Sequence, residues 1–180
     1  MSPLRQYLVI LAAGLWLGGF TFYATVVVPT GAEILGGSTE QGFITRVVTW
    51  YLNLIAAGAL AVLLWNVLAT RGKLLAATWL AMAGAQVALF VLHPRLDAML
   101  DPATHGVADE FHILHEVYLW IAAVQWGLGL AHVWLVLAAW RNAANPASVA
   151  HRAFCQRTVP EVAQVSGARV AEGRPERNNT

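Results

Sequence analysis

An uncharged apolar run covers positions 47–69 and reads VVTWYLNLIAAGALAVLLWNVLA. Three similar runs cover positions 7–28, 74–92 and 113–139, and Glu116 is the only charged residue in any of them. Each has about the 20 residues that an α-helix needs to cross the ~30 Å hydrocarbon core of a bilayer. Because a backbone in lipid must satisfy its own hydrogen bonds, we expect four transmembrane helices.

The composition agrees with this interpretation. Hydrophobic residues make up 58% of the chain and charged residues only 12%, whereas a soluble domain carries about 25% charged residues. The eight tryptophans are typical of membrane interfaces. No basic patch is interleaved with aromatic residues, which excludes nucleic acid as a partner. The predicted fold class is therefore all-α, an integral membrane four-helix bundle with short loops and a polar C-terminal tail.

The expected organisation is a transmembrane bundle over residues 1–141 and a partly disordered cytoplasmic tail over residues 142–180. The run 7–28 is too long for a signal peptide and lacks a small-residue cleavage site. Pro29 is expected to end this first span, because proline cannot continue a helix.

The positive residues near the span ends predict the orientation. Arg46 and Arg95 fall on one side of the membrane. The other side carries Arg5, Arg71, Lys73, Arg141, Arg152 and Arg157. This asymmetry places both termini in the cytoplasm of a bacterial-type inner (plasma) membrane, with loops 29–46 and 93–112 outside.

Small residues recur every fourth position on three of the spans, a spacing that lets helix backbones approach closely. We expect these faces to pack inside the bundle, and a homo-oligomer interface is the alternative. The positions are Gly14 and Gly18; Ala77, Ala81 and Ala85; and Ala123, Gly127 and Ala131.

Histidine and carboxylate residues gather around the outer loop 93–112. His112, His115 and Glu116 are related by i, i+3 and i+4, so they share one face of a helix. The third helix is expected to kink at Pro94 and continue, with Asp101-Pro102 starting a further helix. Such an outer hairpin would bring His93 or Asp97 close to the His112 face.

Imidazole and carboxylate groups are ligands of zinc, copper and non-haem iron. The candidate metal ligands are His93, Asp97, His112, His115 and Glu116. Histidines from two helices could also hold a haem, with His93, His115 and His132 as the candidate cofactor ligands. The alternative is that these residues are wetted and hydrogen-bonded at the membrane interface.

Polar residues inside the spans lie at similar depths. Tyr23, Asn53, Gln86 and the somewhat deeper Gln125 are expected to meet in the bundle interior, because amides in lipid need partners. They could join the helices through hydrogen bonds, or they could form the floor of a cavity that opens to the outside. His132 lies apart, in the inner half of the fourth span, where it could form one hydrogen bond with Asn66.

Several short motifs resemble a known group of proteins. They are LWLGGF at 15–20, VVP at 27–29, and FHILH at 111–115 followed by Trp120. Together they resemble the small four-span bacterial membrane proteins near the copper-resistance D group and a related family of unknown function, over about residues 5–141. The resemblance implies a four-helix membrane bundle with a periplasmic role in copper or redox handling.

Two functions remain open at this point. The first is metal or haem binding at the outer His/carboxylate cluster. The second is an accessory or scaffold subunit of a larger respiratory or photosynthetic membrane complex, with the lipid bilayer and other membrane proteins as partners. No catalytic residues are assigned, because no nucleophile and base pair is visible.

Overall fold

Helices make up nearly all of the described chain. The computed structural model describes residues 2–36, 38–101, 106–107 and 110–144. Its elements, in chain order, are α1 (Pro3–Phe22), the π-helical turn η1 (Tyr23–Val27), α2 (Val28–Leu35), α3 (Ser38–Thr70), α4 (Lys73–Ala98), β1 (Leu100–Asp101), β2 (Gly106–Val107) and α5 (Phe111–Ala144). The prediction of an all-α four-helix bundle is confirmed, and β1 and β2 are the only strands among these residues.

Four helical stretches are long and apolar enough to cross a bilayer: Pro3–Leu35, Gln41–Thr70, Lys73–Ala98 and Phe111–Ala144. In the apolar window of each stretch, only 22–28% of the residues are buried inside the protein. The remaining apolar surface needs lipid rather than water around it. The chain is therefore a multi-pass membrane protein.

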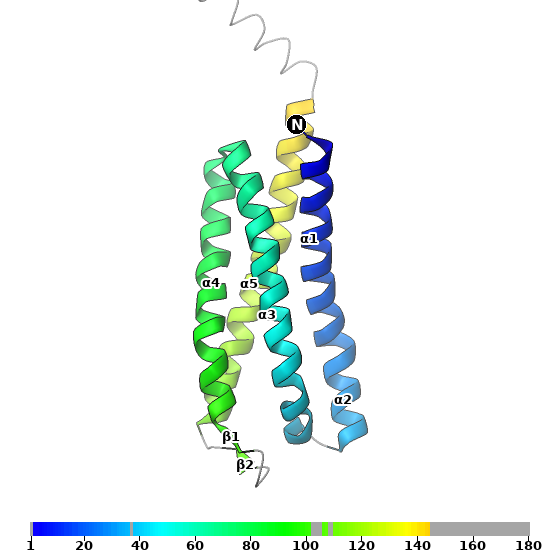
Figure 1. Ribbon diagram of the computed structural model, residues 1–180, viewed down its shortest axis with the longest axis vertical. Helices are drawn as coiled ribbons and strands as arrows, with labels where there is room; N and C mark the ends of the chain where they lie inside the picture. Colours follow the sequence, from blue (N-terminus) through cyan, green and yellow to red (C-terminus); the bar gives the residue numbers. More distant parts are fainter. Residues whose placement is uncertain (1, 37, 102–105, 108–109, 145–180) are drawn as a thin grey trace, which may run out of the picture. The chain divides into compact units, whose positions relative to one another are not determined.

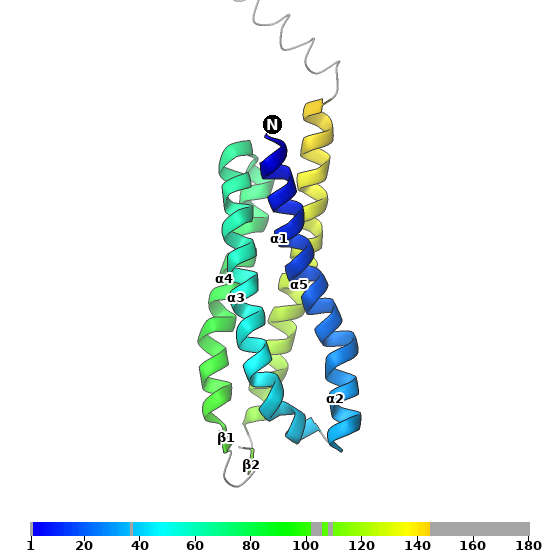
Figure 2. The same ribbon diagram turned by 45° about the vertical axis from the view of Figure 1, so that its right-hand side comes forward.

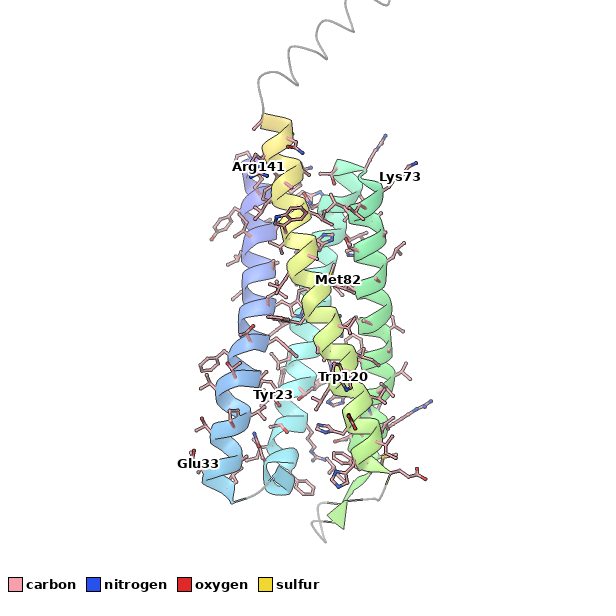
Figure 3. The ribbon with its side chains drawn as sticks, turned by 180° about the vertical axis from the view of Figure 1, so that it is seen from behind. Tyr23, Glu33, Lys73, Met82, Trp120 and Arg141 are labelled. Atoms are coloured by element: carbon pink, nitrogen blue, oxygen red, sulfur yellow. The ribbon has the colours of Figure 1, made fainter. Side chains whose placement is uncertain are left out.

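Exposed aromatic side chains occur towards both ends of the apolar part of α3. On α3, Tyr51 is 60% exposed and Trp65 is 48% exposed, and their 14-residue separation corresponds to about 21 Å along the axis. Trp120 on α5 is 68% exposed and projects outward (Figure 3). Exposed Trp and Tyr side chains of this kind are common on the lipid-facing surface of membrane proteins near the interfaces.

The chain divides into two compact units, residues 1–136 and 137–180. In the first unit, the helices run up and down in succession (Figure 1), and α3 packs against both α1 and α4. Figure 2 shows the same helices from a second side. We call the end with β1 and β2 the β end, and the end with the Arg71–Gly72 connection the turn end. Of the second unit, the structure describes residues 137–144, the last turns of α5.

The prediction that Pro29 ends the first helix is wrong. The helix passes through the π turn η1 and continues as α2 to Leu35. Within η1, the Val28 N–H bonds to the Tyr23 carbonyl, five residues earlier. Pro29 is the second residue of α2, in the first turn, where a proline without an N–H is tolerated. α2 ends at Gly36, whose positive φ of 76° favours glycine.

The third long helix continues beyond its proline, as predicted. Pro94 lies inside α4, which ends at Ala98. A further helix starting at Asp101-Pro102 is not observed, because Asp101 belongs to β1. Leu100 and Asp101 pair antiparallel with Val107 and Gly106. This two-residue ladder satisfies backbone groups between α4 and α5, and periodicity alone did not predict it.

The small-residue faces do not pack inside the bundle, contrary to the prediction. A Cβ built at Gly14, Gly18 or Gly127 would meet no neighbouring atom within 4 Å, and all three glycines are exposed. The close approach occurs instead at Gly129, where a Cβ would lie 2.8 Å from Cδ2 of Leu17. The regularly spaced small residues therefore lie on the outer surface of the bundle, and the contact between α1 and α5 uses a different glycine.

Candidate functional site

A chain of hydrogen bonds between buried side chains joins three helices inside the bundle. The Asn53 Nδ2 on α3 donates to the Tyr118 hydroxyl on α5 at 2.8 Å. The Gln86 Nε2 on α4 donates to Asn53 Oδ1 at 3.3 Å. The Gln125 Nε2 on α5 donates to Gln86 Oε1 at 2.9 Å and to the Met82 carbonyl at 3.2 Å. We call Asn53, Gln86, Tyr118 and Gln125 the amide chain.

The depth of polar residues within the predicted spans identified Asn53, Gln86 and Gln125 as interacting residues. It did not identify Tyr118, the fourth member of the amide chain. Tyr23 was expected to join it, but its hydroxyl bonds instead to Thr49 Oγ1 at 3.3 Å. Tyr118 takes that place. A signal for Tyr118 was present, since it precedes Gln125 by seven residues, and two helical turns place both on one face. Each side-chain hydrogen bond between membrane helices contributes about 0.6 kcal/mol on average.

His93 lies at the β end beside the amide chain. Its Nε2 is 3.0 Å from the carbonyl oxygen of Arg46 on α3. Its ring centroid is 5.5 Å from that of Trp50 and 6.5 Å from that of Tyr118. A carbonyl only accepts hydrogen bonds, so Nε2 is assigned the proton. In a neutral ring, Nδ1 then keeps the lone pair that a metal ligand requires.

Asp97 is held in an ion pair next to His93. Its Oδ1 is 3.0 Å from Nη1 of Arg46, and the two side chains are 47% and 34% exposed. The carboxylate therefore helps to dock α4 on α3. An ion pair of this exposure contributes at most about 1 kcal/mol, since water screens it.

The other predicted ligands lie on α5. His112, His115 and Glu116 are all exposed. The His115 ring stacks on Phe111, with centroids 5.3 Å apart and ring planes 10° from parallel. The His112 ring meets the same Phe111 edge-on at 6.0 Å. Phe111 itself packs against the buried cluster of Leu89, Leu96, Tyr118 and Ala122, so it fixes the position of both imidazoles.

The predicted metal ligands thus fall into two groups. His93 and Asp97 are tied to Arg46 of α3, whereas the His112 group lies on an exposed face of α5. Within residues 2–36, 38–101, 106–107 and 110–144, no three His, Cys, Asp or Glu side chains are placed to hold a metal ion. His105 and Asp109, which belong to the same outer loop 93–112, lie outside the described residues.

His132 lies in a separate layer near the turn end. It is fully buried, and its Nδ1 is 2.8 Å from Thr78 Oγ1 of α4. The predicted hydrogen bond between His132 and Asn66 is not formed. His132 Nε2 and both amide atoms of Asn66 are buried without a partner among the described residues.

No protein-family model, curated protein or solved structure matches the chain. The resemblance to the copper-resistance D group therefore stays a prediction. The established description is that of a polytopic membrane protein with a four-helix bundle.

Proposed function

We propose that this protein is an accessory subunit of a larger membrane assembly, and that helices of its partners pack against its small-residue faces. The observation that carries this proposal is the outward direction of those faces. Gly14 and Gly18 on α1 and Gly127 on α5 are exposed, and a Cβ at each would meet no neighbouring atom within 4 Å.

The alanines with the same spacing support the proposal. Ala77 and Ala81 of α4 and Ala123 and Ala131 of α5 are also exposed. In lipid, helices associate through close van der Waals packing, and small residues allow their backbones to approach. An outward small-residue face therefore offers a partner helix a closer approach than the bulky side chains around it.

The test uses leucine substitutions at exposed glycines, where the larger side chain should not disturb the fold of the protein itself. Gly18→Leu and Gly127→Leu add bulk where the bundle has open space, so the melting temperature should hold. The same side chains would block a partner helix. The expected result in mild detergent is that the wild type runs as a complex larger than its own 19.4 kDa, and that one or both variants lose the partner.

The matched control is Val124→Leu, which changes an exposed α5 residue (56% exposed) that is already bulky. It should keep the complex. A wild type that is monomeric in mild detergent and in native lipid particles contradicts the proposal. Complexes that survive both glycine substitutions also contradict it.

A second candidate function is metal or haem binding at the β end. Two observations support it. His112 and His115 are exposed one helical turn apart and held by Phe111. The bond from His93 to a carbonyl is the kind of partner that fixes the tautomer of a ligating histidine. The described side chains offer pairs of ligands rather than a set of three, so water or other groups would complete the coordination.

Elemental analysis of the mildly solubilised protein, purified without chelators, tests this candidate. Near-stoichiometric copper, zinc or iron that is lost in the His112→Ala/His115→Ala double variant supports it, and a haem would add its visible absorption band. The control variant is Glu33→Ala, which changes an exposed acidic residue on α2 at the same end. Full metal retention in the double variant contradicts the candidate.

The membrane and the orientation are also part of the proposal. The excess of Lys and Arg near Arg71 and Lys73 supports a cytoplasmic turn end in a bacterial-type inner membrane. The β end, with His93 and His115, would then face the periplasm. The resemblance to the copper-resistance D group supports the same placement and a role in copper or redox handling.

A further inference from the structure

Of the five buried side-chain polar atoms that lack a hydrogen-bond partner among the described residues, three lie in one layer near the turn end, and the other two are Nε of Arg5 and Nε1 of Trp140. Asn66 of α3 and His132 of α5 are both 0% exposed. Nδ2 and Oδ1 of Asn66 and Nε2 of His132 have no hydrogen-bond partner among the described residues. The amide chain is different, because Asn53, Gln86 and Gln125 bond to one another and to Tyr118.

The Arg71–Gly72 connection allows the depths of these residues to be compared. Asn66 lies four residues before the end of α3 at Thr70, which is about 6 Å along the axis. Thr78 lies five residues after the start of α4 at Lys73, which is about 7.5 Å. His132 contacts Thr78 directly, with Nδ1 2.8 Å from Oγ1. The three side chains therefore occupy one layer, contributed by three helices.

The tautomer of His132 is assigned from the hydrogen bonds of the Thr78 hydroxyl. The single hydrogen of this hydroxyl is placed to bond to the carbonyl of Leu74 or Leu75, each 3.1 Å away. Towards His132 the hydroxyl oxygen then accepts, so Nδ1 is assigned the proton. Nε2 is left with a bare lone pair that can only accept. Asn66 adds two N–H donors and one carbonyl acceptor.

Apolar side chains surround this layer. Leu63 and Met82 are 0% exposed and lie between it and the amide chain, and Met82 is in the turn-end half of α4 (Figure 3). Val136, one turn beyond His132, is 1% exposed. A buried amide without a partner carries a desolvation penalty of about 1–3 kcal/mol. The three atoms together therefore favour a bound molecule that supplies the missing hydrogen bonds.

We propose that Asn66, Thr78 and His132 form a buried site for water, bound between α3, α4 and α5. Water donates to the His132 lone pair and exchanges hydrogen bonds with the Asn66 amide. Buried waters typically make about three such bonds to polar groups that otherwise lack partners. The neutral lining gives a small ion no compensating charge.

The direct test is water-edited NMR of the full-length protein in lipid bilayers, with ¹⁵N-labelled histidine and asparagine. Magnetisation from water should reach His132 Nε2 and the Asn66 amide. The internal control is ¹⁵N-labelled Gln125, whose amide donates to Gln86 and Met82 and should stay dry. Absence of transfer to both His132 and Asn66, with transfer visible at exposed histidines, overturns the proposal.

A stability comparison provides an independent test. Asn66→Leu removes partners of the bound water, so it should lower the melting temperature by at least about 2 °C. If no water is bound in this layer, Asn66→Leu should instead raise the melting temperature, because it removes a buried amide that has no hydrogen-bond partner. The comparison variant is Asn53→Leu, which breaks bonds to Tyr118 and Gln86 and should lower the melting temperature in either case. A more stable Asn66→Leu protein overturns the proposal.

Discussion

Replacing Gly129 by alanine is expected to destabilise the bundle, because the added Cβ would overlap side chains of α1. The added Cβ would lie 2.8 Å from Leu17 Cδ2 and 3.0 Å from Trp16 Cη2. Carbon atoms in good contact are about 3.5–4.0 Å apart. Trp16 and Leu17 are 4% and 8% exposed, so both side chains are packed inside the bundle and would have to shift.

The change in the free energy of unfolding caused by Gly129→Ala is the sum of two opposing contributions. Overpacking of a well-packed interior typically costs about 1–3 kcal/mol. Glycine to alanine inside a helix returns up to about 1 kcal/mol of helix propensity. Gly127→Ala receives the second term alone, since its Cβ meets no neighbouring atom within 4 Å. The two alanine variants should therefore differ by about 1–3 kcal/mol, which is the overpacking term.

Thermal melts of the two variants in the same detergent measure this difference. For a chain of this size, each kcal/mol shifts the melting temperature by about 2–4 °C, so Gly129→Ala should melt about 2–12 °C below Gly127→Ala. Because both substitutions replace a glycine of α5 by alanine, any general effect of alanine on a membrane helix is the same in the two variants. A Gly129→Ala protein that melts at or above the temperature of Gly127→Ala would refute the assigned contact between α1 and α5.

Three further outcomes are expected at the β end. Tyr118→Phe removes the acceptor of the Asn53 amide and should lower stability by about 1 kcal/mol; an unchanged thermal melt would show that this bond contributes nothing. Asp97→Asn weakens the half-exposed pair with Arg46 and should change stability by less than about 1 kcal/mol, an effect that salt reduces; a larger loss that persists in high salt contradicts this. His93→Phe removes the Nε2 bond to the Arg46 carbonyl and should increase hydrogen exchange near the start of α3, whereas unchanged exchange argues against that bond.

The number and type of helices could be predicted because lipid makes strict demands on the sequence. Uncharged apolar runs of the required length have few alternatives to a spanning helix, and all four runs lie within such helices. The ends of the helices were less predictable. Pro29 lies in the first turn of α2, directly after the π turn η1, and a π turn depends on backbone geometry that periodicity does not encode.

Hydrogen-bond partners inside the bundle could be predicted where the depth of a polar residue within its span was sufficient to identify them. Asn53, Gln86 and Gln125 lie at neighbouring depths, and buried amides must pair with whatever polar group is available. Small-residue spacing was less informative, since Gly127 and Gly129 share one helix and only Gly129 touches α1. Which of two such glycines faces a neighbour depends on the rotation of the helix. An apolar sequence encodes that rotation poorly, because both lipid and protein accept the same side chains.

The distribution of satisfied and unsatisfied polar groups separates structural sites from candidate functional ones. The amide chain meets its own hydrogen-bonding needs across three helices, so its presence is explained by bundle stability. Asn66 and His132 are equally buried, but both amide atoms of Asn66 and Nε2 of His132 lack partners among the described residues. In a membrane interior, where an unpaired polar group is costly and an ionisable one is a functional candidate by default, the second arrangement calls for a ligand. The search for chemistry inside this bundle should therefore begin at the turn end, with the water site, and not at the more conspicuous amide chain.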